Sequence, residues 1–384
     1  MALLEASGIG KNFGDTKVLK DISLTLEQGE ALAIIGSSGS GKTTLLRCLN
    51  FLERPDTGII KVNGETMWDA ADPATQRESE IRKKRLHFGL VFQNFNLFPQ
   101  YTALQNVMLA GELLAKERPD YKANKKAIHA ELEQQAQELL AQMGLSARAG
   151  HYPHQLSGGQ QQRIALARAL VISPDVLLMD EPLSNLDAKL RVEMRSVIRH
   201  TQKSVGITTV YVTHDQEEAM AISDRIAVMK DGVIQHVGTP RDIYQRPKNV
   251  FVATFIGRTN IVNAHVKDGI ITFADGYHEH IDALDKAAEQ DVRCSIRPEE
   301  FIICKDGTDG IHGTVQECTY LGLNTHYTID TDQGDSVEIV EESSIGEGLK
   351  KGEKVLLKVK KEKINVFTKD GGTNLIRSDA YEKQ

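Results

Sequence analysis

The hydrophobic and polar positions of the chain follow one pattern up to about residue 237 and a different pattern after it. In the first part, apolar runs such as residues 31–35 and 176–179 show no polar alternation, as expected for strands buried on both faces of a parallel sheet. Segments of this kind alternate with helical patterns from Leu4 to about Val237. This order predicts an α/β domain over residues 1–237, with helices on the faces of a parallel sheet.

Residues 94–172 within this domain are mostly helical by pattern. A polar helical stretch covers residues 115–142, and another helix is expected over residues 160–171. We therefore expect a helical subdomain inside the α/β domain. The polar segment 66–85 contains the single tryptophan, Trp68, and is expected to form a surface excursion between two strands.

After residue 237 the predicted elements are short strands separated by glycine and aspartate turns. These strands are expected at residues 262–266, 270–273, 292–296, 313–318, 325–329, 337–340 and 355–359. Their spacing is typical of a small antiparallel barrel or sandwich. We expect a linker over residues 238–260, a β-rich domain over residues 261–370 and a frayed polar tail over residues 371–384.

A glycine-rich segment directly follows the predicted strand at residues 31–35. It consists of Gly36, Ser37, Ser38, Gly39, Ser40, Gly41, Lys42 and Thr43, followed by Thr44. This is the phosphate-loop pattern, in which successive backbone N–H groups and a helix N-terminus face the phosphates of a nucleoside triphosphate. Lys42 is then expected to reach the β- and γ-phosphates, and the Thr43 hydroxyl to bind Mg²⁺. The alternative interpretation is a glycine-rich turn without a ligand.

Two carboxylates, Asp180 and Glu181, follow the buried strand at residues 176–179. Ligands of parallel sheets bind at the carboxyl ends of the strands. Asp180 is therefore a candidate partner of Mg²⁺, and Glu181 is a candidate to orient the attacking water or accept its proton. The alternative is an acidic pair at the surface.

The segment Ser157, Gly158, Gly159 and Gln160 predicts a helix N-terminus with open amides. Ser157 is a good N-cap residue, and the two glycines leave N–H groups of the first turn accessible to an anion. Because the phosphate loop already covers one side of a triphosphate, we expect this second terminus to close over the nucleotide bound by another copy of the chain. An ordinary capped helix is the alternative.

In their order along the chain, the phosphate loop, the Ser157 segment and the Asp180–Glu181 pair resemble the nucleotide-binding subunit of an ATP-binding-cassette (ABC) transporter, over about the first 240 residues. The resemblance implies a head-to-tail homodimer that holds two ATP molecules between the phosphate loop of one copy and the Ser157 segment of the other. It also implies that Phe13 stacks on adenine, that Gln93 senses Mg²⁺ and the membrane partner, that Asp187 lies in the loop crossing the dimer, and that His214 contacts the γ-phosphate. Taken singly, Phe13 is compatible with core packing, Gln93 with a solvated loop, and His214 with a histidine satisfied inside a strand end.

The second part of the chain resembles the TOBE-type accessory domain of importer ATPases, at residues 295–300 and 320–322. The implied fold class is an α/β P-loop ATPase core with a helical subdomain, followed by a small all-β barrel of the OB-like kind. Such a domain could bind a regulator or small ligand, or it could stabilise the dimer. In the resembled family the helical subdomain also accepts a coupling helix of the membrane subunit, so Phe95, Leu97 and Phe98 are candidates for that groove. Packing within the subdomain is the alternative for these aromatic and apolar residues.

Composition and charge agree with these expectations. With 384 residues, the chain is long enough for two domains. Its 46 Lys and Arg against 53 Asp and Glu give a formal net charge of −7, which argues against a general nucleic-acid-binding surface. The four cysteines lack metal-ligand spacing and are expected to be reduced, as in a cytoplasmic protein. No secretory signal is expected, and no apolar stretch approaches the roughly 18 residues that span a bilayer, so a membrane pathway must come from another polypeptide.

We therefore expect the ATPase subunit of a bacterial-type solute importer, bound to separate permease subunits at the cytoplasmic face of the membrane. An extracytoplasmic solute-binding protein would be an indirect partner, and no nucleic acid is expected. The solute stays open, because residues 92–99 resemble amino-acid importers whereas residues 186–190 and the accessory domain resemble sugar, iron and polyamine importers. Two alternatives are a soluble cassette ATPase acting on ribosomes or nucleic acid and a P-loop kinase for a small metabolite. The negative charge and the single cassette disfavour the first, and the second would not need the Ser157 segment.

Overall fold

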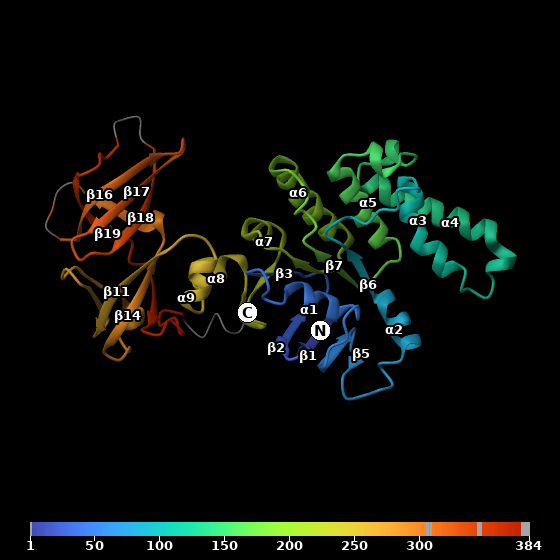
Figure 1. Cartoon of the computed structure of the whole chain (residues 1–384), viewed down its shortest axis with the longest axis horizontal. Helices are drawn as coiled ribbons and strands as arrows, with labels where there is room; N and C mark the ends of the chain where they lie inside the picture. Colours follow the sequence, from blue (N-terminus) through green and yellow to red (C-terminus); the bar gives the residue numbers. More distant parts are fainter. Residues whose placement is uncertain (1, 305–306, 308, 344–347, 378–384) are drawn as a thin grey trace. The chain divides into compact units, whose positions relative to one another are not determined.

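The computed structural model of the chain describes residues 2–304, 307, 309–343 and 348–377. The chain folds into two compact units, residues 1–240 and residues 241–384, which are described separately (Figure 1). The first unit mixes helices and strands, and the second consists mostly of strands. The change of sequence pattern near residue 238 falls beside the boundary between them.

A six-stranded sheet forms the centre of the first unit, in the order β10-β9-β3-β8-β7-β6. Its strands are β3 (Ala31–Gly36), β6 (Phe88–Val91), β7 (Val176–Asp180), β8 (Thr208–Val212), β9 (Arg225–Lys230) and β10 (Val233–Gly238). Neighbouring strands are parallel except β9 and β10. Every residue of β3 and β8 is buried, which explains the absence of polar alternation there. Ile34 and Asp180 both pair with Val212, so the carboxyl ends of β3, β7 and β8 meet at one edge.

A four-stranded antiparallel sheet in the order β2-β1-β4-β5 completes the strands of the first unit. It contains β1 (Leu4–Phe13), β2 (Thr16–Leu26), β4 (Thr57–Val62) and β5 (Glu65–Asp69). The predicted surface excursion over residues 66–85 is wrong in its first part, because β5 occupies it. Trp68 is only 1% exposed and stacks on Phe51, with ring centroids 5.9 Å apart. The remainder of the segment contains α2 (Glu78–Lys84), which buries Ile81 and carries the basic residues Arg82, Lys83 and Lys84 in its last turn.

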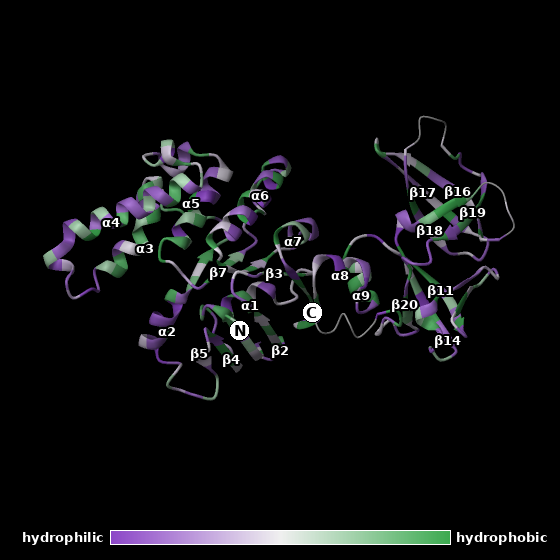
Figure 2. Ribbon diagram, turned by 180° about the vertical axis from the view of Figure 1, so that it is seen from behind, coloured by the Kyte–Doolittle hydropathy of each residue, from purple (hydrophilic) through white to green (hydrophobic). Residues whose placement is uncertain are grey.

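A helical subdomain is built from α3 (Ala103–Ala115), α4 (Tyr121–Gln142) and α5 (Gly158–Leu170). Val107, Leu140 and Ile164 from these three helices share one hydrophobic cluster with Leu177 of β7. In Figure 2, β7 is drawn as hydrophobic whereas hydrophilic residues predominate along α2. The cluster thus attaches the subdomain to the strand that carries Asp180.

Three further helices border the carboxyl edge of the six-stranded sheet: α1 (Lys42–Leu49), α6 (Ala188–Val205) and α7 (Gln216–Ile222). Helix α1 begins one strand-to-helix turn after β3, α6 follows β7, and α7 follows β8. Each loop between a strand and its helix therefore lies at the edge where ligands of parallel sheets bind.

The second unit begins with two short helices, α8 (Pro240–Gln245) and α9 (Val250–Phe255), and continues as two five-stranded antiparallel sheets. The first sheet has the order β13-β12-β11-β14-β20, with β11 (Asn260–Lys267), β12 (Ile270–Phe273), β13 (His278–His280), β14 (Gln290–Ile296) and β20 (Asn365–Thr368). The second has the order β15-β19-β16-β17-β18, with β15 (Phe301–Cys304), β16 (Ile311–Tyr320), β17 (Asn324–Thr331), β18 (Ser336–Glu342) and β19 (Lys354–Val359). One hydrophobic cluster draws on both sheets, which confirms the all-β class predicted for this part. All seven predicted strands lie within observed ones, whereas β13, β15 and β20 were not predicted.

The chain around the two short helices differs from the expected linker and tail. Helices α8 and α9 occupy much of the segment 238–260. Residues 372–377, placed by the sequence in a frayed tail, return to this segment: Asn374 Nδ2 donates to the Pro247 carbonyl at 2.8 Å, and Arg377 pairs with Asp242 at 3.2 Å. The polar composition of residues 372–377 predicts exposure, whereas Asn374 and Arg377 are satisfied by hydrogen bonds within the second unit. Residues 378–384 of the predicted tail lie outside the described residues.

Candidate functional site

The turn between β3 and α1 forms a cradle at the carboxyl edge of the sheet. Gly39 and Gly41 have φ values of 79° and 99°, a left-handed backbone that glycine adopts without strain. A Cβ on Gly36 would lie 2.3 Å from the Met229 carbonyl oxygen, so a side chain has no room there. Helix α1 begins at Lys42, as the sequence predicted, and its N-terminal amides face the cradle.

The Lys42 ammonium lies over the cradle and is held by its carbonyl groups. Its Nζ donates to the Gly36 carbonyl at 2.9 Å and to the Ser37 carbonyl at 3.0 Å. Burial lowers the pKa of Lys42, while the nearby carboxylates Glu181 and Asp180 act to raise it. A cation that already sits over the loop is placed to turn toward a bound phosphate.

A hydroxyl and a carboxylate meet beside Lys42. Thr43 Oγ1 donates to Asp180 Oδ1 at 3.0 Å, which joins the start of α1 to the end of β7. Burial raises the pKa of Asp180, and the hydrogen bond from Thr43 acts against it. Hard oxygen ligands of these two types are the kind that Mg²⁺ prefers, so this pair fits a magnesium ion held together with phosphate oxygens.

Glu181 and His214 form a second contact at the same edge. His214 Nδ1 and Glu181 Oε2 are 3.0 Å apart. The Glu181 amide donates to the Val212 carbonyl at 2.9 Å, so the loops after β7 and β8 are tied together. Glu181 has a φ of 44°, a strained value for a residue with a side chain, and such strain is concentrated at functional positions.

These side chains surround one open pocket of 530 Å³, which we call the phosphate pocket. It is lined by Phe13, Val18, Ser38, Gly39, Gly41, Lys42, Thr43, Thr44, Glu181 and His214. Phe13 is 47% exposed, which disfavours core packing for this residue, and the Lys11 ammonium lies 5.3 Å from its ring centroid. Gly36, Ser37 and Asp180 do not line the pocket but bond to Lys42 or Thr43, which do, and Ser40 lies buried in the same turn. Val18 was missed by the sequence analysis, although its place on β2, joined to β1 by a tight turn after Phe13, could have suggested it.

The other predicted site residues do not line the phosphate pocket of their own chain. Ser157 caps α5, accepting from the Gln160 amide at 3.4 Å, while Gln160 Oε1 accepts from the Ser157 amide at 3.0 Å. Asp187 caps α6 and accepts from the Leu190 amide at 2.9 Å. A Cβ on Gly159 would lie 2.8 Å from Leu190 Cδ1, so the two helix N-termini pack against each other.

We call these two helix starts, Ser157–Gln160 on α5 and Asp187 on α6, the paired termini. Gln93 lies close to the loop that leads into α6, because the Gln93 carbonyl accepts from Asn185 Nδ2 at 3.0 Å. Nearby, Phe95 and Leu97 are partly buried against the helical subdomain, and Phe98 is 42% exposed. Arg168 of α5 donates to the Phe95 carbonyl at 2.7 Å and so fixes this segment to the subdomain.

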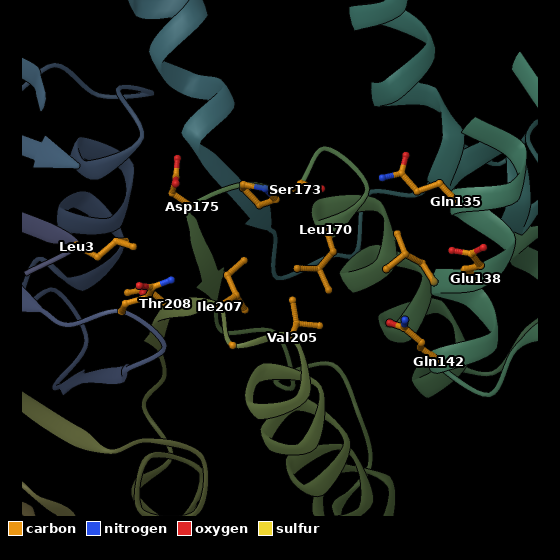
Figure 3. A pocket seen from close by; sticks show the side chains of 14 residues that line it. Leu3, Gln135, Glu138, Gln142, Leu170, Ser173, Asp175, Val205, Ile207 and Thr208 are labelled. Atoms are coloured by element: carbon orange, nitrogen blue, oxygen red, sulfur yellow. The ribbon is translucent and has the colours of Figure 1, made fainter. Parts of the chain in front are cut away.

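A second hollow, of 440 Å³, lies at the amino ends of β7 and β8, away from the phosphate pocket (Figure 3). Gln135, Glu138 and Gln142 of α4 line one side, and Leu170 and Ile207 lie across from them. None of the site residues predicted from the sequence lines this hollow.

Across the part of the chain that the structure describes, no helix combines the length and the apolar character that crossing a membrane requires.

Comparison with known proteins identifies the family. Residues 19–184 match the ABC transporter family and residues 294–367 match the TOBE domain. A protein of Fusobacterium nucleatum named "Fe(3+) ions import ATP-binding protein FbpC" is 48% identical over 368 residues, which are 95% of this chain and 93% of that protein. The "Spermidine/putrescine import ATP-binding protein PotA" of Aliivibrio fischeri is 39% identical over 357 residues, 88% of each chain.

Among solved structures, a dimeric ATP-binding cassette in a post-hydrolysis state, bound to ADP and phosphate, is 32% identical, with a TM-score of 0.51. The match covers 62% of this chain and 99% of that chain. The sequence relatives, by contrast, extend through the second unit as well. The chain therefore belongs to the ABC transporter family, as an ATP-binding ATPase subunit that carries a C-terminal TOBE domain.

Proposed function

We propose that this chain hydrolyses ATP as a head-to-tail homodimer and thereby powers the import of a small solute through separate permease subunits, at the cytoplasmic face of the membrane. The observation that carries the proposal is the division of the site residues into two groups. One group forms the phosphate pocket, and the other, the paired termini, does not line that pocket in the same chain. The dimeric relative with bound ADP and phosphate supports the view that a second copy of the chain supplies the paired termini to the open side of the phosphate pocket.

In the proposed mechanism, the phosphate loop and Lys42 hold the β- and γ-phosphates, and Phe13 stacks on the base. Glu181 orients the attacking water and accepts its proton as the bond to the γ-phosphate breaks. His214 uses Nδ1 toward Glu181, which leaves Nε2 to contact the γ-phosphate. The amides of Gly158 and Gly159 from the partner copy, which lie between the capping residues Ser157 and Gln160, complete the anion site, with Asp187 beside them.

Thr43 and Asp180 would hold Mg²⁺, with Gln93 as a further contact in the closed dimer. The ion neutralises charge on the phosphates when it is bound. Hydrolysis removes the γ-phosphate that both copies contact, so the dimer loses the interaction that held it closed. This opening is the step that we propose to be transmitted to the permease through the helical subdomain.

For the solute, we propose ferric iron. Relatives named for ferric iron import and for polyamine import both cover more than four fifths of the chain, and the ferric iron importer of Fusobacterium nucleatum is the more similar of these two, at 48% against 39% identity. An extracytoplasmic binding protein would deliver the solute to the permease. Deletion of the gene should abolish uptake of radioactive ferric iron and leave spermidine uptake unchanged. Loss of spermidine uptake alone would reassign the solute.

Co-purification tests the transport function itself. Glu181→Gln should be expressed in native cells with MgATP, extracted from gently solubilised membranes and its partners identified. We expect a polytopic permease to co-purify, with Lys42→Ala as the control that cannot close around ATP. Ribosomes or nucleic acid in place of a permease would favour the soluble ATPase instead.

A further inference from the structure

A buried carboxylate lies behind the phosphate pocket without lining it. Glu218, in the first turn of α7, is 3% exposed. Its Oε2 accepts from the Thr213 hydroxyl at 2.8 Å and from the Tyr211 hydroxyl at 2.9 Å. The Thr213 hydroxyl in turn accepts from the Asp215 amide at 3.0 Å. Glu218 thus fixes the residues on both sides of His214.

The arginines of α6 reach the same group of residues. Arg191 Nε lies 3.8 Å from Glu218 Oε1, and Arg191 Nη1 lies 3.5 Å from Asp215 Oδ2. Arg195 adds a contact of 3.2 Å to the same Asp215 oxygen. Because a buried carboxylate is costly without a cation, these contacts give the loop around His214 a preferred position relative to α6.

Arg191 also contacts the loop that leads into α6. Its Nη2 donates to the Leu186 carbonyl at 3.2 Å, next to Asp187. One guanidinium therefore contacts both the paired termini, through Leu186, and the His214 loop, through Asp215 and Glu218. A rigid planar group that is hydrogen-bonded at one end and ion-paired at the other couples the positions of the two segments.

We propose that Arg191 and Glu218 are positioning residues that link the loop crossing the dimer to His214, so that docking of the partner copy sets His214 for hydrolysis. This inference rests on the proposed function, because it requires the loop at Asp187 to meet the partner and His214 to act on the γ-phosphate. It adds a route within each chain by which closure of the dimer reaches the catalytic edge.

The test compares Arg191→Met with Arg199→Met. Arg199 lies two turns further along α6 and is paired with Asp224, whose other hydrogen-bond partners among the described residues are Ala31 and Lys203, so the second variant is a matched control. For the purified full chain with MgATP, we expect Arg191→Met to lower kcat by about tenfold, with KM within about twofold, and to reduce the cooperativity in ATP. Arg199→Met should keep all three values. Equal effects of the two variants, or a rise in KM that accounts for the whole loss, would overturn the proposal.

Two further variants separate the charge from the hydrogen bonds. Glu218→Gln keeps an oxygen for Thr213 and Tyr211 but loses the attraction to Arg191, so it should lower kcat like Arg191→Met. The double variant Arg191→Met with Glu218→Gln should have a kcat only slightly below that of either single variant, because both substitutions break the same link. Fully multiplicative losses in the double variant would contradict a shared link.

Amide hydrogen exchange provides a readout that does not depend on turnover. Arg191→Met should speed exchange in residues 213–218, and Arg199→Met should not. Unchanged exchange there would overturn the link even if turnover fell. His214→Ala separates the two proposals: full turnover in this variant would remove His214 from the proposed mechanism, whereas an inactive His214→Ala beside a fully active Arg191→Met would remove the coupling alone.

Discussion

The phosphate pocket and the paired termini are both built at helix starts, yet they differ in what surrounds them. The phosphate pocket has a cation, a hydroxyl, two carboxylates and an imidazole within one chain. The paired termini are two helix starts capped by the Ser157 hydroxyl and the Asp187 carboxylate, and none of their residues lines the phosphate pocket of the same chain. The difference indicates that one region carries the reacting groups and the other supplies an anion-binding surface, which completes the site when two copies meet.

The largest effect is expected from the reacting groups. Glu181→Gln should lower ATP turnover by roughly 10³-fold, because an amide neither accepts the proton of water nor carries its charge. The same variant should accumulate as a dimer in MgATP, measured by light scattering on a sizing column. Glu193→Gln, at an exposed position on α6, is the control. Turnover close to that of the unchanged chain would remove Glu181 from the mechanism.

A smaller but still large effect is expected at the paired termini. Ser157→Arg should lower turnover by about 10²-fold, because the larger side chain blocks the amides that face the transferring phosphate. ATP affinity of the monomer, measured by titration calorimetry, should stay the same. Ser146→Arg, at an exposed position in the same subdomain, should change neither value. Loss of monomer affinity in Ser157→Arg would mean that this helix start acts on the nucleotide of its own chain.

The aromatic wall of the phosphate pocket should affect binding without affecting the chemical step. Phe13→Ala should weaken ATP binding by about tenfold, the size expected for one stacked base. Phe98→Ala removes a ring of similar exposure outside the pocket and should leave the affinity unchanged. Equal affinities for all three chains would place the base elsewhere.

A substitution at the amino edge of the sheet, where Asp224 lies, should lower the stability of the fold without changing the ATPase activity. Burial alone would raise the pKa of Asp224. Hydrogen bonds from Arg199, the Ala31 amide and Lys203 outweigh this effect and lower the pKa to about 2. The unfolded value is about 3.9, so this stabilisation is present above about pH 4 and is lost as the pH falls toward 2. Asp224→Asn should remove about 1 kcal/mol at neutral pH, after allowance for solvent screening, and less at pH 3. Urea unfolding at both pH values measures the free energy of unfolding of the two chains. An equal loss of stability at both pH values would contradict the lowered pKa of Asp224.

The parts of the site that the sequence predicted are those that local patterns determine. Helix α1 begins at Lys42, and Asp180 ends β7, because a buried strand followed by glycines or carboxylates places its end residues at a known edge. Trp68 and Asn374 were misplaced because their polar neighbours suggested exposure, whereas their partners, Phe51 and Pro247, are distant in sequence. The link from Arg191 to Glu218 has no sequence pattern of its own, since it depends on how α6 packs beside α7.

The central claim, that the paired termini complete the phosphate pocket of another copy, is tested most directly by crosslinking. A chain with Ser38→Cys and Ser157→Cys, with Cys304 and Cys318 replaced by serine and with Glu181→Gln, should be treated with a short thiol crosslinker in the presence of MgATP. We predict a product of twice the chain mass on a denaturing gel, absent without ATP and absent from each chain that carries only one of the two introduced cysteines beside the buried Cys48 and Cys294. A crosslink that forms within single chains, with no product of double mass, would contradict the account.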